Sequence, residues 1–149
     1  MNLLQTFVKA FDVTLSFSIA NIKKISAHYF FAQEPQCVIS EKIKQDLFAI
    51  GLPLGMIKKR IFVPSFVFLD MIAISTKHKA IVNEKAEWLF ICGRDVFKEG
   101  VLECHSKPGE LVIVLNTRKE CLGYGRVVHR NKVFIENILD RGDFLRRER

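Results

Sequence analysis

Residues 86–101, AEWLFICGRDVFKEGV, join a continuous apolar run to a short polar segment that ends at a glycine. The apolar run at residues 88–92 has the length of a strand, which predicts a buried strand. Asp95 can accept hydrogen bonds from backbone amides at the start of a helix, and Gly100 suits the left-handed residue that ends one. The sequence therefore predicts a strand followed by a very short helix over residues 95–99.

Arg94 lies at the start of this predicted helix. The N-terminus of a helix presents unpaired N–H groups and a partial positive charge, so an adjacent guanidinium makes it a candidate site for a phosphate or another anion. The alternative is an ordinary strand-to-helix corner with Arg94 in solvent. These residues alone leave both readings open.

The composition is that of a folded, basic protein. The chain has 149 residues, 49% of them hydrophobic, which is enough for one domain or for two small ones. A formal net charge of +7 suggests a polyanionic partner such as RNA, DNA or an acidic membrane surface. The local excess lies at residues 118–132, which hold one acidic residue, although such a run can also be a solvated surface. Its basic residues are Arg118, Lys119, Arg126, Arg130 and Lys132.

The sequence carries no evident targeting or metal-binding pattern. Its longest apolar stretch, residues 61–74, is interrupted by polar residues and is shorter than the roughly 20 residues that span a bilayer. The first residues lack the cationic region of a secretory signal, so an intracellular protein is expected. The four cysteines form no C-x-x-C pair, which argues against a zinc site and predicts structural thiols. No cofactor or metal is expected.

The first half of the chain is predicted to mix helices and strands. Apolar residues recur at helical spacing at the N-terminus, and Ser40 is placed as the N-cap of a second helix. The mostly apolar segment at residues 65–74 fits a helix or a strand equally well. The predicted elements are a helix over residues 1–11, a hairpin of strands over 27–31 and 37–39, a helix over 40–50 and a strand over 56–63.

A polar stretch at residues 75–79 separates this unit from a second one that is rich in short strands. The boundary there predicts two domains, residues 1–78 and residues 79–149. Short strands with turns at this spacing suggest a small, partly closed β-barrel. The predicted strands lie at residues 101–104, 110–115, 121–128 and 133–135, with turns at 107–109 and 116–119.

Two further details of the second unit bear on its shape. Gly123 and Gly125 flank Tyr124 inside a predicted strand, where missing side chains usually mark a bulge, a barrel corner or close approach by another backbone. In the tail, Phe144 and Leu145 are expected to pack while the neighbouring arginines stay outside.

The stretches WLFICGRDVFKEGV and LVIVLNTRKECLGYGRVV resemble a PUA domain, the RNA-binding module named for pseudouridine synthases and archaeosine transglycosylases. The resemblance extends to VISEKIKQDLFAIG, GMIKKRIFV and FIENILDRGDFLRRER, which are similar, in the same order, to the Nip-seven family of ribosome biogenesis factors, of the UPF0113 type. Together these stretches cover roughly residues 27–149. The implied fold class is α+β, with an N-terminal α/β domain followed by a C-terminal PUA-type small β-barrel.

The resemblance implies a non-catalytic protein that binds pre-ribosomal RNA and ribosome assembly proteins during rRNA processing and large-subunit assembly. A monomer without membrane association is expected, cytoplasmic in a prokaryote and nuclear or nucleolar in a eukaryote. Tyr124 could stack on an unpaired base, although such a tyrosine is more often part of the core. The implied RNA-binding residues are Arg94, Arg118, Lys119, Arg126, His129, Arg130 and Lys132.

Catalysis is not expected, because no nucleophile, base or metal cluster has a convincing spacing. The four histidines are scattered, and the Gly-Tyr-Gly sequence lacks the third glycine of a dinucleotide-binding turn. Two alternatives to the RNA-binding assembly factor remain. One is an accessory RNA-binding subunit of an RNA-modification enzyme, and the other is a protein-interaction scaffold whose apolar first domain docks a partner.

Overall fold

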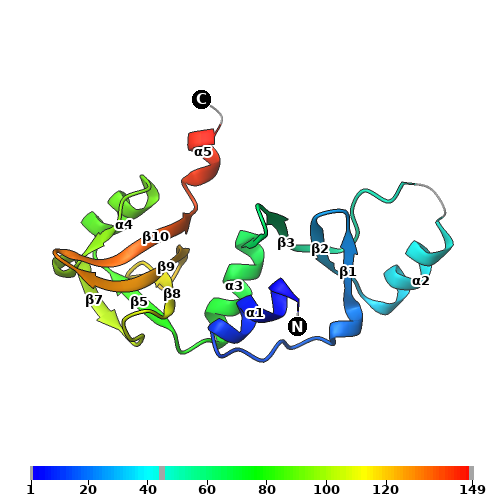
Figure 1. The fold of residues 1–149 in the computed structure, drawn as a ribbon, viewed down its shortest axis with the longest axis horizontal. Helices are drawn as coiled ribbons and strands as arrows, with labels where there is room; N and C mark the ends of the chain where they lie inside the picture. The colour runs from blue at the N-terminus through cyan, green and yellow to red at the C-terminus, as the bar shows by residue number, and fades with distance from the viewer. Residues whose placement is uncertain (1, 44–45, 148–149) are drawn as a thin grey trace.

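Two β-sheets lie on either side of a pair of helices in the computed structural model, which describes residues 2–43 and 46–147 (Figure 1). The first sheet is antiparallel throughout and has the order β1-β2-β3-β4. Each neighbour in the sheet follows its predecessor along the chain, so the sheet is a simple meander. Its strands are β1 (Ile22–Ile25), β2 (His28–Phe31), β3 (Leu52–Lys58) and β4 (Ile61–Pro64).

The second sheet has the order β6-β10-β9-β8-β5-β7, and its β5–β8 pair is parallel while the other pairs are antiparallel. Bulges interrupt several of these pairings, which bends the sheet. Its strands are β5 (Lys79–Val82), β6 (Val96–Phe97), β7 (Val101–Cys104), β8 (Leu111–Leu115), β9 (Cys121–Arg130) and β10 (Val133–Asp140). The strands predicted at residues 101–104, 110–115, 121–128 and 133–135 are thereby confirmed as β7 to β10, together with the turns between them, whereas β5 and β6 are not predicted from the sequence.

Helices α1 and α3 lie between the two sheets, whereas α4 covers the second sheet on its other side (Figure 1). Within the described residues, no helix combines the length and the apolar character needed to cross a membrane. The helices are α1 (Leu3–Ala10), η1 (Ile19–Asn21), α2 (Glu34–Lys42), α3 (Phe66–Ser75), α4 (Glu84–Ile91), η2 (Lys98–Gly100) and α5 (Asp143–Arg147), where η marks a 3₁₀ turn.

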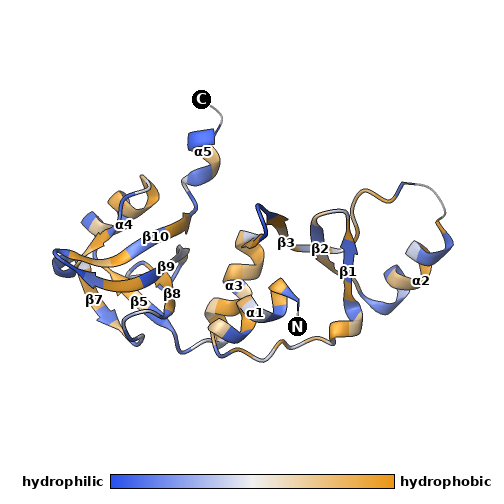
Figure 2. Cartoon of the chain, in the orientation of Figure 1, coloured by the Kyte–Doolittle hydropathy of each residue, from blue (hydrophilic) through white to orange (hydrophobic). Residues whose placement is uncertain are grey.

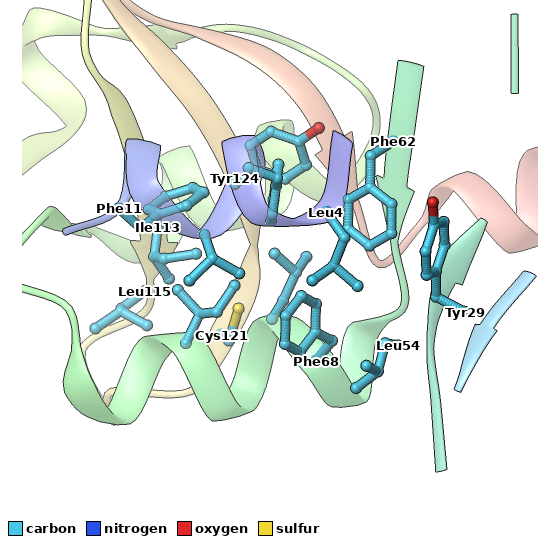
Figure 3. Packing of buried hydrophobic residues seen from close by; sticks show 14 residues of the cluster. Leu4, Phe11, Tyr29, Leu54, Phe62, Phe68, Ile113, Leu115, Cys121 and Tyr124 are labelled. Atoms are coloured by element: carbon cyan, nitrogen blue, oxygen red, sulfur yellow. The ribbon is translucent and has the colours of Figure 1, made fainter. Parts of the chain in front are cut away.

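One hydrophobic core joins the two halves of the chain. On β8, Ile113 and Leu115 belong to this shared core, whereas the alternate residue Val114 faces the other side of the sheet. The ring of Tyr124 on β9 meets the ring of Phe11 at the end of α1 edge-on, with 6.1 Å between the ring centroids (Figure 3). It meets the ring of Phe7 on α1 in the same way, at 5.4 Å. The outer face of the β8–β9 pair is therefore buried against the N-terminal helices.

A second core lies on the opposite face of the same sheet, the face that α4 covers. Phe90 from the helix packs there with Val112, Val127 and Ile135 from three strands, and all four are fully buried. Because each of the central strands is covered on both faces, β8 is apolar along its whole length rather than alternating.

The strand predicted at residues 88–92 is wrong, because this segment belongs to helix α4. Asn83 caps the helix by accepting a hydrogen bond from the amide of Ala86 at 2.9 Å, and Glu84 lies in the first turn. The apolar run is not buried throughout: Phe90 is fully buried, whereas Trp88 is 69% exposed. One helical face, and not a whole strand, is therefore in the core.

The short helix predicted at residues 95–99 is confirmed only at its end, as the 3₁₀ turn η2 (Lys98–Gly100). Residues 96–97 form edge strand β6, and the carboxylate of Asp95 accepts a hydrogen bond from the amide of Asn137 instead of capping a helix. Gly100 is not left-handed. A Cβ there would lie 2.6 Å from the Cβ of Ala86, so close packing against α4 requires the glycine.

Three predictions for the first half need correction. Residues 37–39 lie in α2 and not in a strand, so β2 pairs with β1 and β3. The helix predicted over 40–50 begins earlier and ends at Lys42, and residues 44 and 45 of that prediction lie outside the described residues. The strand predicted over 56–63 is a hairpin of β3 and β4.

The undecided segment at residues 65–74 is helix α3, which Ser65 caps by accepting a hydrogen bond from the amide of Phe68 at 3.1 Å. Figure 2 shows α3 coloured as hydrophobic along most of its length. This composition follows from its position, because α3 contacts both β3 and β9. The predicted N-terminal helix is confirmed as α1.

The packing predicted for the tail is reversed. Phe144 and Leu145 are exposed, whereas Arg146 donates two hydrogen bonds to the buried carboxylate of Asp140, at 3.0 and 2.8 Å. Arg146 also donates to the carbonyl of Ile91 at the end of α4. The tail is held by this polar contact rather than by apolar packing.

Candidate nucleic-acid interface

The turn between β9 and β10 brings three of the predicted RNA-binding residues together. Arg130 ends β9 and pairs with Val133 at the start of β10, with Lys132 in the turn between them. His129 has a left-handed backbone (φ 47°), and its ring lies against the ring of Phe134 with 4.4 Å between centroids. The side chains of His129, Arg130 and Lys132 are all exposed, and they lie together at one tip of the second sheet.

Lys98 joins this tip from a different part of the chain. Its amide donates a hydrogen bond to the carbonyl of Lys132 at 3.0 Å, because edge strand β6 runs beside the start of β10. Lys98 is not evident as a site residue from the sequence, because the sequence pattern predicts a helix there. The set Lys98, His129, Arg130 and Lys132 is called the hairpin-tip cluster below. Within the part of the chain that the structure describes, none of its cations forms an ion pair.

A hollow of about 520 Å³ opens beside the hairpin-tip cluster. The ring of Phe97, which is 45% exposed, forms one side of it, next to Lys98 and Lys132. Glu99 contributes a carboxylate to the same hollow. An exposed aromatic ring between two lysines offers a stacking surface and cations to a nucleotide at one place.

Arg126 lies on β9 but is not part of the tip. Its Nη1 donates a hydrogen bond to the carbonyl of Gly109 at 2.7 Å, which fixes the turn before β8. Glu136 lies directly across from it on β10. Arg126 therefore holds a local turn and keeps only part of its donor capacity for a ligand.

Arg118 and Lys119 lie at the opposite end of the sheet. They are in the turn that precedes β9, and β9 is ten residues long, so about 30 Å of strand separates them from Arg130. Arg118 is already paired with Glu120 at 3.0 Å. Hydrogen bonds from Asn116 and from Arg118 lower the pKa of Glu120, and the bond to Glu120 raises the pKa of Arg118.

Arg94 is exposed, and its surroundings differ from the predicted anion site. It follows the C-terminal end of α4, where its amide donates to the carbonyl of Leu89. The C-terminal end of a helix carries a partial negative charge, so the dipole opposes an anion at this place. The expectation of an anion site at a helix N-terminus is therefore wrong, and its physical basis is lost with the short helix.

Tyr124 is a core residue, so the stacking alternative is wrong. The residue is 5% exposed and packs against Phe7 and Phe11. Burial raises its pKa to about 12 and raises the pKa of the neighbouring Cys121 thiol to about 11. Its glycine neighbours behave as predicted: a Cβ at Gly123 would lie 2.0 Å from the carbonyl oxygen of Leu139, where β10 crosses a bulge.

The described residues contain no group of histidine, cysteine or carboxylate side chains that could hold a metal ion. All four cysteines are free, and their exposure ranges from buried Cys121 to exposed Cys92. A hollow of about 890 Å³ lies beside α3 and the turn before β9, with Asp70 and Arg141 among its lining residues. Arg141 occupies part of this hollow, because it donates hydrogen bonds to the carboxylate of Asp70 at 2.5 Å and to the carbonyl of Cys121 at 2.6 Å.

Comparisons with known proteins agree with this architecture. Residues 78–149 match the family model described as UPF0113 PUA domain. A UPF0113 protein of Archaeoglobus fulgidus is 38% identical over 86 residues, which cover 50% of this chain and 49% of that protein. The chain thus spans about half the length of this curated relative.

Two solved archaeal structures share the fold. A conserved PUA domain protein from Thermoplasma acidophilum superposes with a TM-score of 0.59 at 14% sequence identity, covering 96% of this chain and 89% of its own. A hypothetical protein from Pyrococcus horikoshii gives a TM-score of 0.50 at 18% identity, covering 62% of this chain and 65% of its own. The fold is therefore α+β, with a PUA-type domain in the C-terminal half.

Proposed function

We propose that this protein binds RNA through the hairpin-tip cluster of its PUA-type domain. The observation that carries the proposal is that Lys98 and Lys132 line one hollow with the exposed ring of Phe97, with Arg130 in the same hairpin, and that the described residues show no ion pair to neutralise these cations. PUA domains commonly bind RNA, which agrees with the match of residues 78–149 to that class of domain.

Fixed cations of this kind bind the phosphate backbone and release counterions, so the affinity depends steeply on salt. The backbone hydrogen bond between Lys98 and Lys132 keeps these two residues adjacent, so their side chains reach the same stretch of the bound strand. The ring of Phe97 stacks on an unpaired base and favours single-stranded segments. Arg94, Arg118 and Lys119 lie away from this cluster, and Arg118 is already paired with Glu120, so none of the three belongs to the proposed contact.

The cellular role belongs to the same proposal. The resemblance of the chain to the Nip-seven family supports a non-catalytic role in pre-rRNA processing and large-subunit assembly, together with ribosome assembly proteins. In this role the protein acts as a monomer in the cytoplasm of a prokaryote or the nucleolus of a eukaryote.

The test compares RNA binding by the full chain with that of two variants. Changing Lys98, Arg130 and Lys132 to Gln removes three phosphate contacts, so the slope of log affinity against log salt should fall by about 2 for single-stranded RNA. The control is Arg118→Gln, which removes a single cation that is already paired with Glu120 and should leave the slope nearly unchanged. Equal slopes for the unchanged chain and the triple variant would refute the proposed interface.

A protein-docking role is the second candidate, and it rests on the exposed apolar side chains around α2. Val38, Ile39 and Phe48 are 47%, 58% and 94% exposed. Pull-down of assembly proteins by the full chain, compared with an Ile39→Asp, Phe48→Asp variant, separates this role from RNA binding. Loss of the partners with RNA affinity intact would favour the scaffold.

A further inference from the structure

The hairpin of β3 and β4 ends in a two-residue turn made of Lys59 and Arg60. Lys58 and Ile61 are paired across the hairpin, so these two residues alone form its loop. Both have left-handed backbones, with φ angles of 49° and 64°. The turn therefore has the conformation of a type I′ hairpin loop.

Lys and Arg are unfavourable residues for this turn. In the left-handed region the Cβ of an ordinary residue crowds the following carbonyl, which is why Asn-Gly is the preferred pair in such loops. Two cationic residues instead occupy both strained positions. The turn fixes the backbone from which both cationic side chains project, and both side chains are exposed.

The neighbouring hairpin places another cation at the same end of the sheet. The carbonyl of Ala27, in the turn between β1 and β2, accepts a hydrogen bond from the amide of Ile57 at 2.7 Å, so the two turns lie side by side. Lys24 precedes that turn, with its Nζ 5.8 Å from the ring centroid of Tyr29. The set Lys24, Lys58, Lys59 and Arg60 is called the sheet-end cluster below.

The sheet supplies no carboxylate to neutralise these cations. Residues 13–33 and 47–69, which contain all four of its strands, include no Asp or Glu. The ion pair that the described residues show on this sheet joins Lys23 to Glu41 of α2 at 3.5 Å, and it leaves the sheet-end cluster unpaired. In Figure 2 the free tip of this hairpin, beside the β3 label, is coloured hydrophilic above the apolar α3.

We infer that the sheet-end cluster is a second contact for the phosphate backbone of RNA, separate from the PUA-type domain. The inference rests on the proposed function, since it takes the same RNA as the ligand. These four cations form no ion pair with the residues that the structure describes, so they attract a polyanion, and the fixed two-residue turn orients two of them. The protein thus contacts one RNA at two places, one on each sheet.

The decisive variant changes Lys59 to Asn and Arg60 to Gly in the full chain. Asn-Gly is the preferred pair for this turn, so the midpoint of thermal unfolding should rise while RNA binding weakens. Two lost phosphate contacts should reduce the salt slope by about 1.4 and weaken binding roughly 10- to 30-fold near ~0.1 M salt. Opposite changes in stability and affinity would separate the role of the side chains from that of the fold.

The charge-matched control changes Lys9 and Lys85 to Gln. Both lysines are exposed and lie on α1 and α4, away from the sheet-end cluster. Binding by the Asn-Gly variant that equals binding by this control would overturn the inference. So would a variant that keeps its RNA affinity but loses binding to phosphatidylserine vesicles, because the cluster would then face a membrane.

The hairpin-tip variant, tested in parallel, separates the two proposals. If the hairpin-tip variant weakens RNA binding and the Asn-Gly variant matches its control, the second contact is refuted and the proposed function stands. If the unchanged chain binds no RNA, the proposed function fails and the inference fails with it. If the Asn-Gly variant alone weakens binding, the RNA contact lies on the first sheet and not on the PUA-type domain.

Discussion

Asp140 and Arg146 show how a single ion pair fixes the C-terminal segment. The carboxylate of Asp140 is 3% exposed and accepts two hydrogen bonds from Arg146 and one from Asn137. The bond to Asp140 also raises the pKa of Arg146. Gly142 allows the C-terminal segment to lie close to the end of α4, because a Cβ at this position would lie 1.9 Å from the carbonyl oxygen of Ile91.

Arg146→Met is predicted to lower the free energy of unfolding by about 2 kcal/mol, because it leaves a buried carboxylate without its cation. This loss of stability is smaller than the loss expected for a fully buried ion pair, since Arg146 itself is 40% exposed. Urea unfolding measures the change, and Arg147→Met serves as the control, because Arg147 pairs with Asp143 on the exposed α5. Equal stability of the two variants would contradict the prediction.

Tyr124 and Cys121 are predicted to make the protein sensitive to alkali. Burial raises their pKa values to about 12 and about 11, above the ordinary 10.0 and 9.0, so the folded protein keeps protons that the unfolded chain releases. Stability should therefore fall as the pH rises from about 9 towards 12. Urea titrations at several alkaline pH values should show a shallower decline for Tyr124→Phe. Parallel declines would contradict this account.

At the scale of elements, α4 shows why a short apolar run is ambiguous. Trp88 to Ile91 has the length of a strand, but Asn83 begins a helix before it and Gly93, with φ 86°, follows its end. The helix cap and the glycine lie outside the apolar run, so the hydrophobic pattern of the run alone cannot distinguish a helix from a strand. Once the helix is placed, edge strand β6 and the position of Lys98 follow from it.

Asn83→Ala is predicted to destabilise the protein by about 1 kcal/mol, because the amide of Ala86 loses its hydrogen-bond acceptor. Asn83→Asp keeps an acceptor at the same place and should stay close to the original stability. Thermal unfolding followed by circular dichroism distinguishes the two. If both substitutions cost the same, the cap makes no net contribution to stability.

At the scale of the whole molecule, the two sheets share a core and should unfold together. Phe7 on α1 contacts Phe62 of the first sheet and Tyr124 of the second, with ring centroids 5.3 and 5.4 Å apart. Phe7→Ala is therefore predicted to cost about 3 kcal/mol and to leave a single transition with a lower midpoint. Calorimetry checks this prediction, and two resolved transitions in the unchanged chain would contradict it.

The sequence predicts strands β7 to β10 and the turns between them well, because hydrophobic runs there alternate with turns rich in glycine and polar residues, but it misses β5, α4 and β6. It predicts the first half less well, since α2 buries no side chain and its pattern gives no periodic signal. Among the residues of the candidate site, the basic residues at positions 118–132 are visible in the sequence. The pairing of Arg118 with Glu120, and the arrival of Lys98 at the tip, depend on strand pairing over long separations.

The outer face of β8 and β9, packed against α1 and α3, limits how the C-terminal half can be used alone. A truncated protein that begins near residue 77 would present Ile113, Leu115 and Tyr124 to water. Such a fragment is expected to aggregate, and grafting this half onto another carrier would require hydrophilic replacements at those three positions.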